Sequence, residues 1–526
     1  MSIKPVSFDG HPADANPEGE HPKAPSSQQL LFLVHPEQVW HGWRATCGAH
    51  LCDHAGMNRP RWHFLLATLA ALGVLLLGLR GALSTFSSGI WGPADPWLNG
   101  DFNGSWWLWW AFSEQWSGTS WWQSVHWPQG MASLAAFFPN PGDMAILGAL
   151  GPPTALKWNL VQLVHLGALL AATVALARAL GATALGSAAG AALVASSPIL
   201  LHEVAGGRPS NLVVWPGVLA LAALVQKRSV TAGLLGALQF VAYVWHGVAL
   251  LLLALPLVQD RKLGLKALGV LSLAILPYLA WLVFNLGGVP MESPPDGYTS
   301  APLAGLLGLD MVPPRFRVHP LLLPLGLVFG WRSERRLLCA VVLGVLVALG
   351  PAPTWAMGDS WMPGVMALLN QVFPPLNRMH HPVRVMLLVL PVLAVLVALG
   401  VDRVRGRVPV AVGVVVLSLA TGKWIDQAST YAQPIQPPYA DLEVPGEGPV
   451  ADPLGARHLT ALSLQPFHRR AIVQGPGSAG GESRAQDAVE YTLLLLRFPD
   501  QAEDAAGLGA ALGPELSPGV YASSLR

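Results

Sequence analysis

The segment RVMLLVLPVLAVLVALGV, residues 384–401, decides the fold class of this chain. Its only charged residue is Arg384, at the first position. An α-helix rises about 1.5 Å per residue, so a helix of this length is close to the thickness of a bilayer's hydrocarbon core. The segment therefore predicts a membrane-spanning helix.

Similar apolar runs occur along most of the chain. We place them at residues 63–80, 158–177, 183–201, 210–226, 230–243, 245–258, 266–285, 320–331, 336–350 and 408–422. Hydrophobic residues make up 52% of the 526 residues and charged residues only 12%, about half the charged fraction of a soluble protein. The sequence predicts an all-α polytopic membrane protein with about eleven transmembrane helices. Its balance of 31 basic and 30 acidic residues argues against nucleic acid as a partner.

The positions of Lys and Arg predict the orientation, because short basic loops stay on the cytoplasmic side. Alternate loops contain the basic residues Arg178, Lys227, Arg228, Arg261, Lys262, Lys266, Arg332, Arg335, Arg336, Arg403, Arg405 and Arg407. The intervening loops contain most of the acidic residues. We therefore expect a multi-pass protein of the plasma (inner) membrane, with a cytoplasmic N-terminus and an extracytoplasmic C-terminus.

The chain divides into three regions. Residues 1–62 have the composition of a disordered cytoplasmic leader, and the change of composition near Met57 leaves open whether Met57 is the true start. Cys and His residues lie close together there, but their spacing fits no standard zinc finger, so no metal site is predicted. Residues 63–423 form the transmembrane module, with long outside loops at 81–157, 286–319 and 351–383. Residues 424–526 predict a small extracytoplasmic subdomain, α/β or irregular, with one helix over Ala485–Phe498.

The first outside loop is the most informative part of the sequence. Ten of the 21 tryptophans lie between Trp91 and Trp127. Aromatic residues at helical spacing predict an amphipathic helix over residues 98–117, lying along the outer membrane surface. Asp101 falls at the start of this helix. It is interpreted either as a helix N-cap or as a general base at the lipid boundary, and the two roles are compatible.

Several short motifs resemble the GT-C class of polytopic glycosyltransferases. The first loop contains Gly100-Asp101 followed by Trp107 and Trp110, then His126-Trp-Pro-Gln-Gly130 and Pro139-Asn140. Later matches are His202-Glu203, Trp215-Pro216, Arg378-Met-His-His-Pro-Val-Arg384 and Leu464-Gln-Pro-Phe-His468. The resemblance extends loosely over residues 63 to about 480. It lacks an Asp-x-Asp pair, and its Arg/Pro/Arg spacing is wider than the usual form.

The resemblance implies a GT-C-like fold and a hexosyl- or pentosyltransferase. The sugar would pass from a polyprenyl-phosphate donor to an extracytoplasmic glycan, lipid or protein acceptor. The catalytic carboxylate of the first loop would be Asp101, with Asp95 as the second candidate. The resemblance leaves open whether a divalent cation is a cofactor. The donor phosphate would contact Arg378, Arg384, His380 and His381, because guanidinium groups suit phosphate oxygens. Acceptor or loop contacts would be His126, His202, Glu203, Trp107 and Trp110.

Polar residues within the apolar runs have a simpler interpretation. Gln162, His165 and Gln239 are expected to form hydrogen bonds between helices. His246 is a further ionisable group in such a run, where ionisable groups are often functional.

Two other function classes remain open from the sequence. A transporter or flippase of lipid-linked precursors would share the apolar helices, although no internal repeat is evident. A catalytically silent membrane scaffold would keep the fold without the chemistry.

Overall fold

The structure is a computed structural model of the whole chain, and it is mostly helical. It describes residues 61–84, 86–87, 89–92, 100–119, 141–286, 301–309, 311–356, 364–372, 379, 381–404, 406–420, 432–434, 450–451, 493–495, 510–517 and 520–525. The chain divides into two compact units at Pro60, and every described residue belongs to the second unit.

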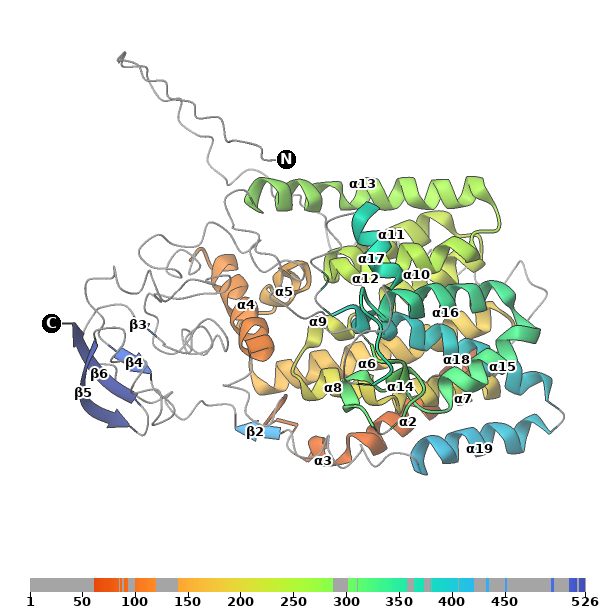
Figure 1. Cartoon of the computed structure of the whole chain (residues 1–526), viewed down its shortest axis with the longest axis horizontal. Helices are drawn as coiled ribbons and strands as arrows, with labels where there is room; N and C mark the ends of the chain where they lie inside the picture. The colour runs from red at the N-terminus through yellow and green to blue at the C-terminus, as the bar shows by residue number, and fades with distance from the viewer. Residues whose placement is uncertain are drawn as a thin grey trace, which may run out of the picture. The chain divides into compact units, whose positions relative to one another are not determined.

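Helices account for most of the elements in Figure 1. The α-helices of the first half are α2 (Arg61–Gly78), α3 (Arg80–Leu83), α4 (Gly100–Trp116), α5 (Pro141–Gly148), α6 (Ala155–Ala179), α7 (Ala184–Ala195), α8 (Pro198–Ala205), α9 (Pro209–Leu212), α10 (Trp215–Val225), α11 (Ser229–Ala242) and α12 (Val244–Ala254). Those of the second half are α13 (Arg261–Leu286), α14 (Leu303–Leu306), α15 (Leu322–Ser333), α16 (Arg335–Ala348), α17 (Val365–Val372), α18 (Met386–Arg403) and α19 (Arg407–Ala420). Short 3-10 helices are η4 (Leu255–Leu257), η5 (Pro314–Phe316) and η7 (Pro382–Val385).

Each of the predicted apolar runs is helical, and the predicted break near Tyr243 is confirmed as the junction of α11 and α12. Within the described residues, three helical segments are long and apolar enough to cross a membrane: Ala155–Ala179, Arg261–Phe284 and Pro382–Arg403. A fourth candidate is α7 with α8, which bend by 48° at a break. The described chain therefore fits insertion in a membrane, and the remaining apolar helices are shorter than a full span.

Helix α18 forms the centre of the helical body and is the segment with which the sequence analysis began. It packs against α7, α15 and α16, which lie beside it in Figure 1. The contact with α7 is close because Gly186 and Gly190 face α18. A Cβ on Gly190 would lie 2.4 Å from the Ala394 carbonyl oxygen, and one on Gly186 would lie 2.5 Å from that of Ala398. Small residues let helix backbones approach in this way, so this pair is fixed in register by its glycines.

Two of the expected interhelical hydrogen bonds connect α10 to its neighbours. The Gln239 amide of α11 donates to the Val213 carbonyl at 2.7 Å and accepts from the Gly217 amide at 3.0 Å. The Trp215 indole N–H donates to His165 Nδ1 of α6 at 3.3 Å. The prediction that Gln239 and His165 make hydrogen bonds between helices is confirmed.

Polar side chains of α6 hold the start of the first long loop. Asn159 donates to the Gly89 carbonyl at 2.7 Å and accepts from the Trp91 amide at 2.8 Å. Gln162 was predicted to bond between helices, but its amide instead donates to the Trp91 carbonyl in a strand, at 3.0 Å. Strand β1 (Gly89–Trp91) is thereby fixed to α6, and it pairs antiparallel with β2 (Ala432–Pro434).

The helix predicted over residues 98–117 is present as α4, but its tryptophan face is covered by protein except at Trp116, which is 66% exposed. Trp106 and Trp110 are each 3% exposed, and Trp109 is fully buried. The rings of Trp106 and Trp109 lie 5.3 and 6.0 Å from the ring of Trp158 on α6. This corrects the expectation that the face contacts lipid headgroups. Aromatic rings lose more water-exposed apolar area in a protein core than at an interface, and α5 and α6 supply that core.

The described part of the C-terminal region consists of β-strands. Strands β3 (Val450–Ala451), β4 (Leu493–Leu495), β6 (Val520–Leu525) and β5 (Ala510–Ser517) form one sheet in that order. Strand β4 is parallel to β3 and antiparallel to β6. The helix predicted over Ala485–Phe498 is therefore wrong at Leu493–Leu495. A short apolar run carries no period that separates a strand from a helix, and pairing with β6 decides the outcome.

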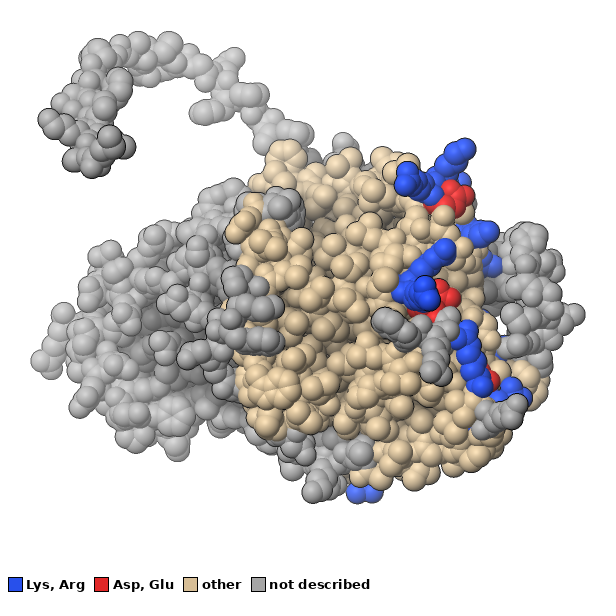
Figure 2. All heavy atoms as spheres, turned by 45° about the vertical axis from the view of Figure 1, so that its right-hand side comes forward, with Lys and Arg blue, Asp and Glu red and all other residues tan. Residues whose placement is uncertain are grey.

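The basic turns lie together on the described surface. Figure 2 shows Lys and Arg in a band along one side of the visible face, with a few acidic residues among them. One of these turns joins α10 to α11, where Lys227 has a φ of 60°, the only positive φ of a non-glycine residue in the described chain. The Lys227 amide donates to the Leu224 carbonyl, and the Arg228 amide donates to the Ala223 carbonyl. This is the left-handed helix end that glycine usually occupies.

Candidate functional site

A buried cluster of charged side chains is centred on Glu203. Its carboxylate accepts a hydrogen bond of 2.7 Å from Asn211 Nδ2. Arg208 Nη1 lies 3.5 Å from the carboxylate, and Arg384 Nε lies 4.0 Å from Oε1. The Glu203 side chain is 5% exposed, and those of Arg208 and Arg384 are 19% and 13% exposed. A buried carboxylate is tolerated only when such partners compensate for its lost hydration.

The local sequence brings Arg208 back over Glu203. Helix α8 starts with a proline after the break from α7, and it ends at the Gly206-Gly207 pair. Gly207 has a φ of 61°, which allows the Arg208 amide to bond to the Glu203 carbonyl at 3.1 Å. Pro209 then begins the single turn α9, which supplies Asn211. Glu203, Arg208 and Asn211 thus come from one compact segment, which consists of α8, a tight turn and α9.

Arg384 reaches the cluster from a distant part of the sequence. It lies in η7, the turn that leads into the central helix α18. Its Nη1 lies 3.4 Å from the Tyr243 hydroxyl oxygen, and its carbonyl oxygen lies 3.3 Å from His246 Nε2. Tyr243 occupies the extended residue between α11 and α12. Four elements, α8, α9, α12 and η7, therefore hold the guanidinium and the carboxylate in place.

The described side chains of this cluster include more basic than acidic groups. Among the described side chains, one carboxylate faces two guanidinium groups, and Arg315 is near enough to affect His202 electrostatically. Arginine forks in a low-dielectric setting are well suited to phosphate or carboxylate oxygens. Arg208 and Arg384 are therefore the described residues with the chemistry to contact an anion such as a phosphate.

A second buried acid is Asp143, near Ser210 of α9. Asp143 of α5 is 6% exposed, and no described residue donates a hydrogen bond of normal geometry to either of its carboxyl oxygens. Burial raises its pKa from 3.8 to about 7, although Ser210 and nearby backbone amides lower it a little. Asp143 also interacts electrostatically with Tyr278 of α13. The Tyr278 hydroxyl is buried and has no hydrogen-bond partner in the described chain. Asp143 is thus a carboxyl group that changes protonation near neutral pH.

The structure brings some of the predicted site residues together. Glu203, His202 and Arg384 meet in the cluster, whereas Trp107 and Trp110 are buried in the aromatic core around α4. Asp101 is the second residue of α4, so it lies inside the helix rather than at the residue before it, and its side chain lies outside the described residues. His381 immediately precedes η7. Asp95, His126, Arg378 and His380 lie outside the described residues, so their proposed roles stay predictions.

Sequence reasoning did not single out the residues that complete the cluster. Asn211 and Tyr243 are common residue types, and neither has a motif of its own. The segment HEVAGGRPSN, residues 202–211, contains the usable signal. An acid, a Gly-Gly pair and then an Arg-Pro predict a tight turn that returns the guanidinium to the carboxylate.

The described residues contain no group of three His, Cys, Asp or Glu side chains that could hold a metal ion. No protein-family model matches the chain, and no curated protein matches it either. The function must therefore be argued from the residues themselves.

Proposed function

We propose that this protein is a GT-C-type membrane glycosyltransferase that uses a polyprenyl-phosphate sugar donor and an extracytoplasmic acceptor. The observation that carries the proposal is the meeting of the Arg208 and Arg384 guanidinium groups at the buried carboxylate of Glu203. The apolar helices and the resemblance of the first-loop motifs add support. A fuller form of the proposal has about eleven spans, a cytoplasmic N-terminus and an extracytoplasmic C-terminus.

In the proposed reaction the acceptor hydroxyl attacks the anomeric carbon of the sugar. The new bond joins the acceptor oxygen to that carbon, and the bond from the carbon to the phosphate oxygen breaks. Asp101 takes the acceptor proton, with Asp95 as the second candidate for this role. Arg384 and Arg208 stabilise the negative charge of the departing polyprenyl phosphate. Glu203 and Asn211 act as positioning residues that hold the two guanidinium groups.

The phosphate role can be tested before the sugar or acceptor is known. The probe is a short-chain polyprenyl monophosphate, and binding to the purified full chain is measured in detergent. We expect Arg384→Gln and Arg208→Gln each to weaken binding by about tenfold or more, since each removes a charge-assisted hydrogen bond. Lys157→Gln is the matched control, because Lys157 donates to the Leu150 and Pro152 carbonyls away from the cluster. Equal binding by all variants would exclude the cluster as the phosphate site.

The chemical role of Asp101 needs a product assay. With a donor identified, Asp101→Asn is expected to lose turnover by about a hundredfold or more while still binding the polyprenyl monophosphate. Unchanged turnover would exclude Asp101 as the base. Absence of product from the unaltered protein with every donor would instead favour a silent scaffold.

One observation favours a lipid-precursor flippase as a second candidate. The α7–α8 segment is broken by a bend of 48°, and broken helices frequently line the substrate sites of transporters. Reconstitution in vesicles with a fluorescent polyprenyl-phosphate lipid separates the two candidates. Protein-dependent movement of the lipid between leaflets, without sugar transfer, would support the flippase.

The orientation has an independent test. Reporter fusions within residues 227–229 and at Lys423 should report opposite sides of the membrane. If both report the same side, the alternation of loops is wrong.

A further inference from the structure

Helix α5 holds the buried Asp143 in close contact with α4 and α11. A Cβ on Gly142 would overlap the Val241 carbonyl oxygen of α11, and one on Gly148 would lie 2.6 Å from the Phe112 Cβ of α4. Packing this close leaves α5 no room to shift toward either helix. An adjustment to the charge of the Asp143 carboxyl must therefore come from the other elements that face it.

The short helix α9 contacts both Asp143 and the Glu203 cluster. Burial raises the pKa of Asp143, and the Ser210 hydroxyl opposes this slightly because it approaches the carboxyl. The next residue, Asn211, donates to Glu203 at 2.7 Å. Arg208, just before α9, lies 3.5 Å from the same Glu203 carboxylate. Neighbouring residues of one turn thus serve two buried acids.

Helix α9 has few backbone hydrogen bonds of its own. It is four residues long, and its N-cap residue Arg208 makes no side-chain cap hydrogen bond. The other helices near Asp143 are α4, α11 and α13, with 17, 14 and 26 residues. Because the backbone bonds of a single turn barely offset the cost of ordering it, α9 is the neighbour of Asp143 that opens most easily.

Few charged groups face Asp143 from the surrounding helices. Helices α9 and α11 contain no charged or titratable side chain, and α4 contains the acids Asp101 and Glu114. The basic residues of α13 lie in its first two turns, twelve or more residues before Tyr278. Among the described groups, Tyr278 is the one that interacts electrostatically with Asp143. A phenol is neutral between pH 5 and pH 8, so Asp143 is the group here that changes charge in this range.

We propose that Asp143 is a positioning residue for the Glu203 cluster and acts through α9. With its proton, the carboxyl is neutral beside Ser210, and α9 holds Asn211 and Arg208 at Glu203. When the carboxyl releases its proton to solvent, a buried charge is left to which no described residue donates a hydrogen bond of normal geometry. Helix α9 then opens to admit water, and Asn211 and Arg208 leave their positions. The consequence for phosphate binding at Arg208 rests on the proposed function.

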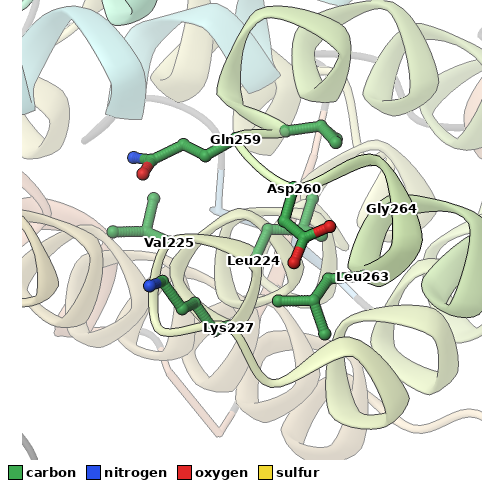
Figure 3. A pocket seen from close by; sticks show the side chains of 8 residues that line it. Leu224, Val225, Lys227, Gln259, Asp260, Leu263 and Gly264 are labelled. Atoms are coloured by element: carbon green, nitrogen blue, oxygen red, sulfur yellow. The ribbon is translucent and has the colours of Figure 1, made fainter.

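Hydrogen exchange of the full chain in detergent tests the link without any ligand. Peptides covering residues 202–212 are followed at pH 5 and pH 8, with intrinsic exchange rates corrected for pH. We expect about tenfold or faster corrected exchange at pH 8, because ionised Asp143 favours the opening of α9. Asp143→Asn cannot ionise and should lose this difference. Asp260→Asn is the control and should keep it, since Asp260 is an exposed acid that lines a separate hollow (Figure 3).

Ser210→Ala is a second variant that leaves Asp143 in place. It removes the hydroxyl that favours the ionised carboxyl, so it should enlarge the pH difference in residues 202–212. Three results would overturn the proposal. They are a pH difference retained by Asp143→Asn, one unaffected by Ser210→Ala, and one of equal size in peptides of α18, which would mean that the whole protein loosens.

Binding of the short-chain polyprenyl monophosphate then measures the effect on the cluster. At pH 5 the unaltered protein and Asp143→Asn should bind it equally. At pH 8 the unaltered protein should bind about tenfold more weakly than the variant, and comparison at one pH cancels the titration of the phosphate itself. Equal binding at pH 8 would refute the positioning role. Absence of binding by both proteins at every pH would instead refute the proposed function, and hydrogen exchange would still decide whether Asp143 controls α9.

Discussion

Burial of Asp143 predicts a stability that depends on pH. Its pKa is raised from 3.8 to about 7 in the folded protein, with burial as the main cause. Between these two pH values the folded chain keeps the proton that the unfolded chain has released. The folded state therefore binds more protons, and the free energy of unfolding falls as the pH rises from about 4 to about 7. Below this range both states are protonated, and above it both are ionised.

The size of the effect follows from the shift. A shift of about three units at about 1.4 kcal/mol per unit corresponds to about 4 kcal/mol lost across the window. Asp143→Asn cannot ionise, so it should remove this part of the pH dependence. At pH 8 the variant should be more stable than the unaltered protein, with a smaller gain at pH 5.

Thermal unfolding in detergent, followed by tryptophan fluorescence, measures the effect from pH 4 to pH 8. The aromatic core of α4 lies close to α5 and provides the signal. Asp260→Asn is a suitable control, because Asp260 is an exposed acid on a different element. Parallel pH profiles for the unaltered protein and Asp143→Asn would refute the reasoning. That result would mean that Asp143 keeps its charge when folded, with a cation or water compensating for it.

Three further predictions concern packing and backbone conformation. Lys227→Gly should raise the free energy of unfolding by about 1 kcal/mol, because glycine adopts the positive φ at this helix end without steric cost; an unchanged or lower melting temperature would contradict this. Gly190→Leu should destabilise the protein by about 1–3 kcal/mol or prevent folding, because a side chain there meets the Ala394 carbonyl. Size-exclusion chromatography of the purified variant checks this. The control is Gly73→Leu, where a Cβ meets nothing within 4 Å. Trp107→Ala should cost about 3–5 kcal/mol, measured by thermal unfolding, since the ring is fully buried; a loss below about 1 kcal/mol would instead point to a surface role.

Helix positions were predictable because the dominant signal is local. A run of apolar residues near the length of a span favours a helix in any packing arrangement, since the backbone must satisfy its own hydrogen bonds in lipid. The break at Tyr243 was also visible as a change in the local pattern. The error at Leu493–Leu495 came from the same source, because a three-residue apolar run has no helical or strand period that could decide between them.

The site was only partly predictable, because its contacts are distant in sequence. The local turn in residues 202–211 brings Arg208 to Glu203 and could be inferred from its glycines and proline. The approach of Arg384 to Glu203 and Tyr243 depends on how α18 packs within the bundle. No spacing in the sequence encodes that approach.

The sequence by itself determined that this is a helical chain with segments long and apolar enough to span a membrane, where its helices lie, and which of its turns are basic. These properties follow from composition and local period, which act over a few residues. Only the tertiary structure decided that Trp106, Trp107, Trp109 and Trp110 of α4 are buried, that Asp143 is buried with a raised pKa, and that two arginines share one carboxylate. Those features depend on which surfaces meet, and burial sets the cost of a charge only after the surrounding elements have packed.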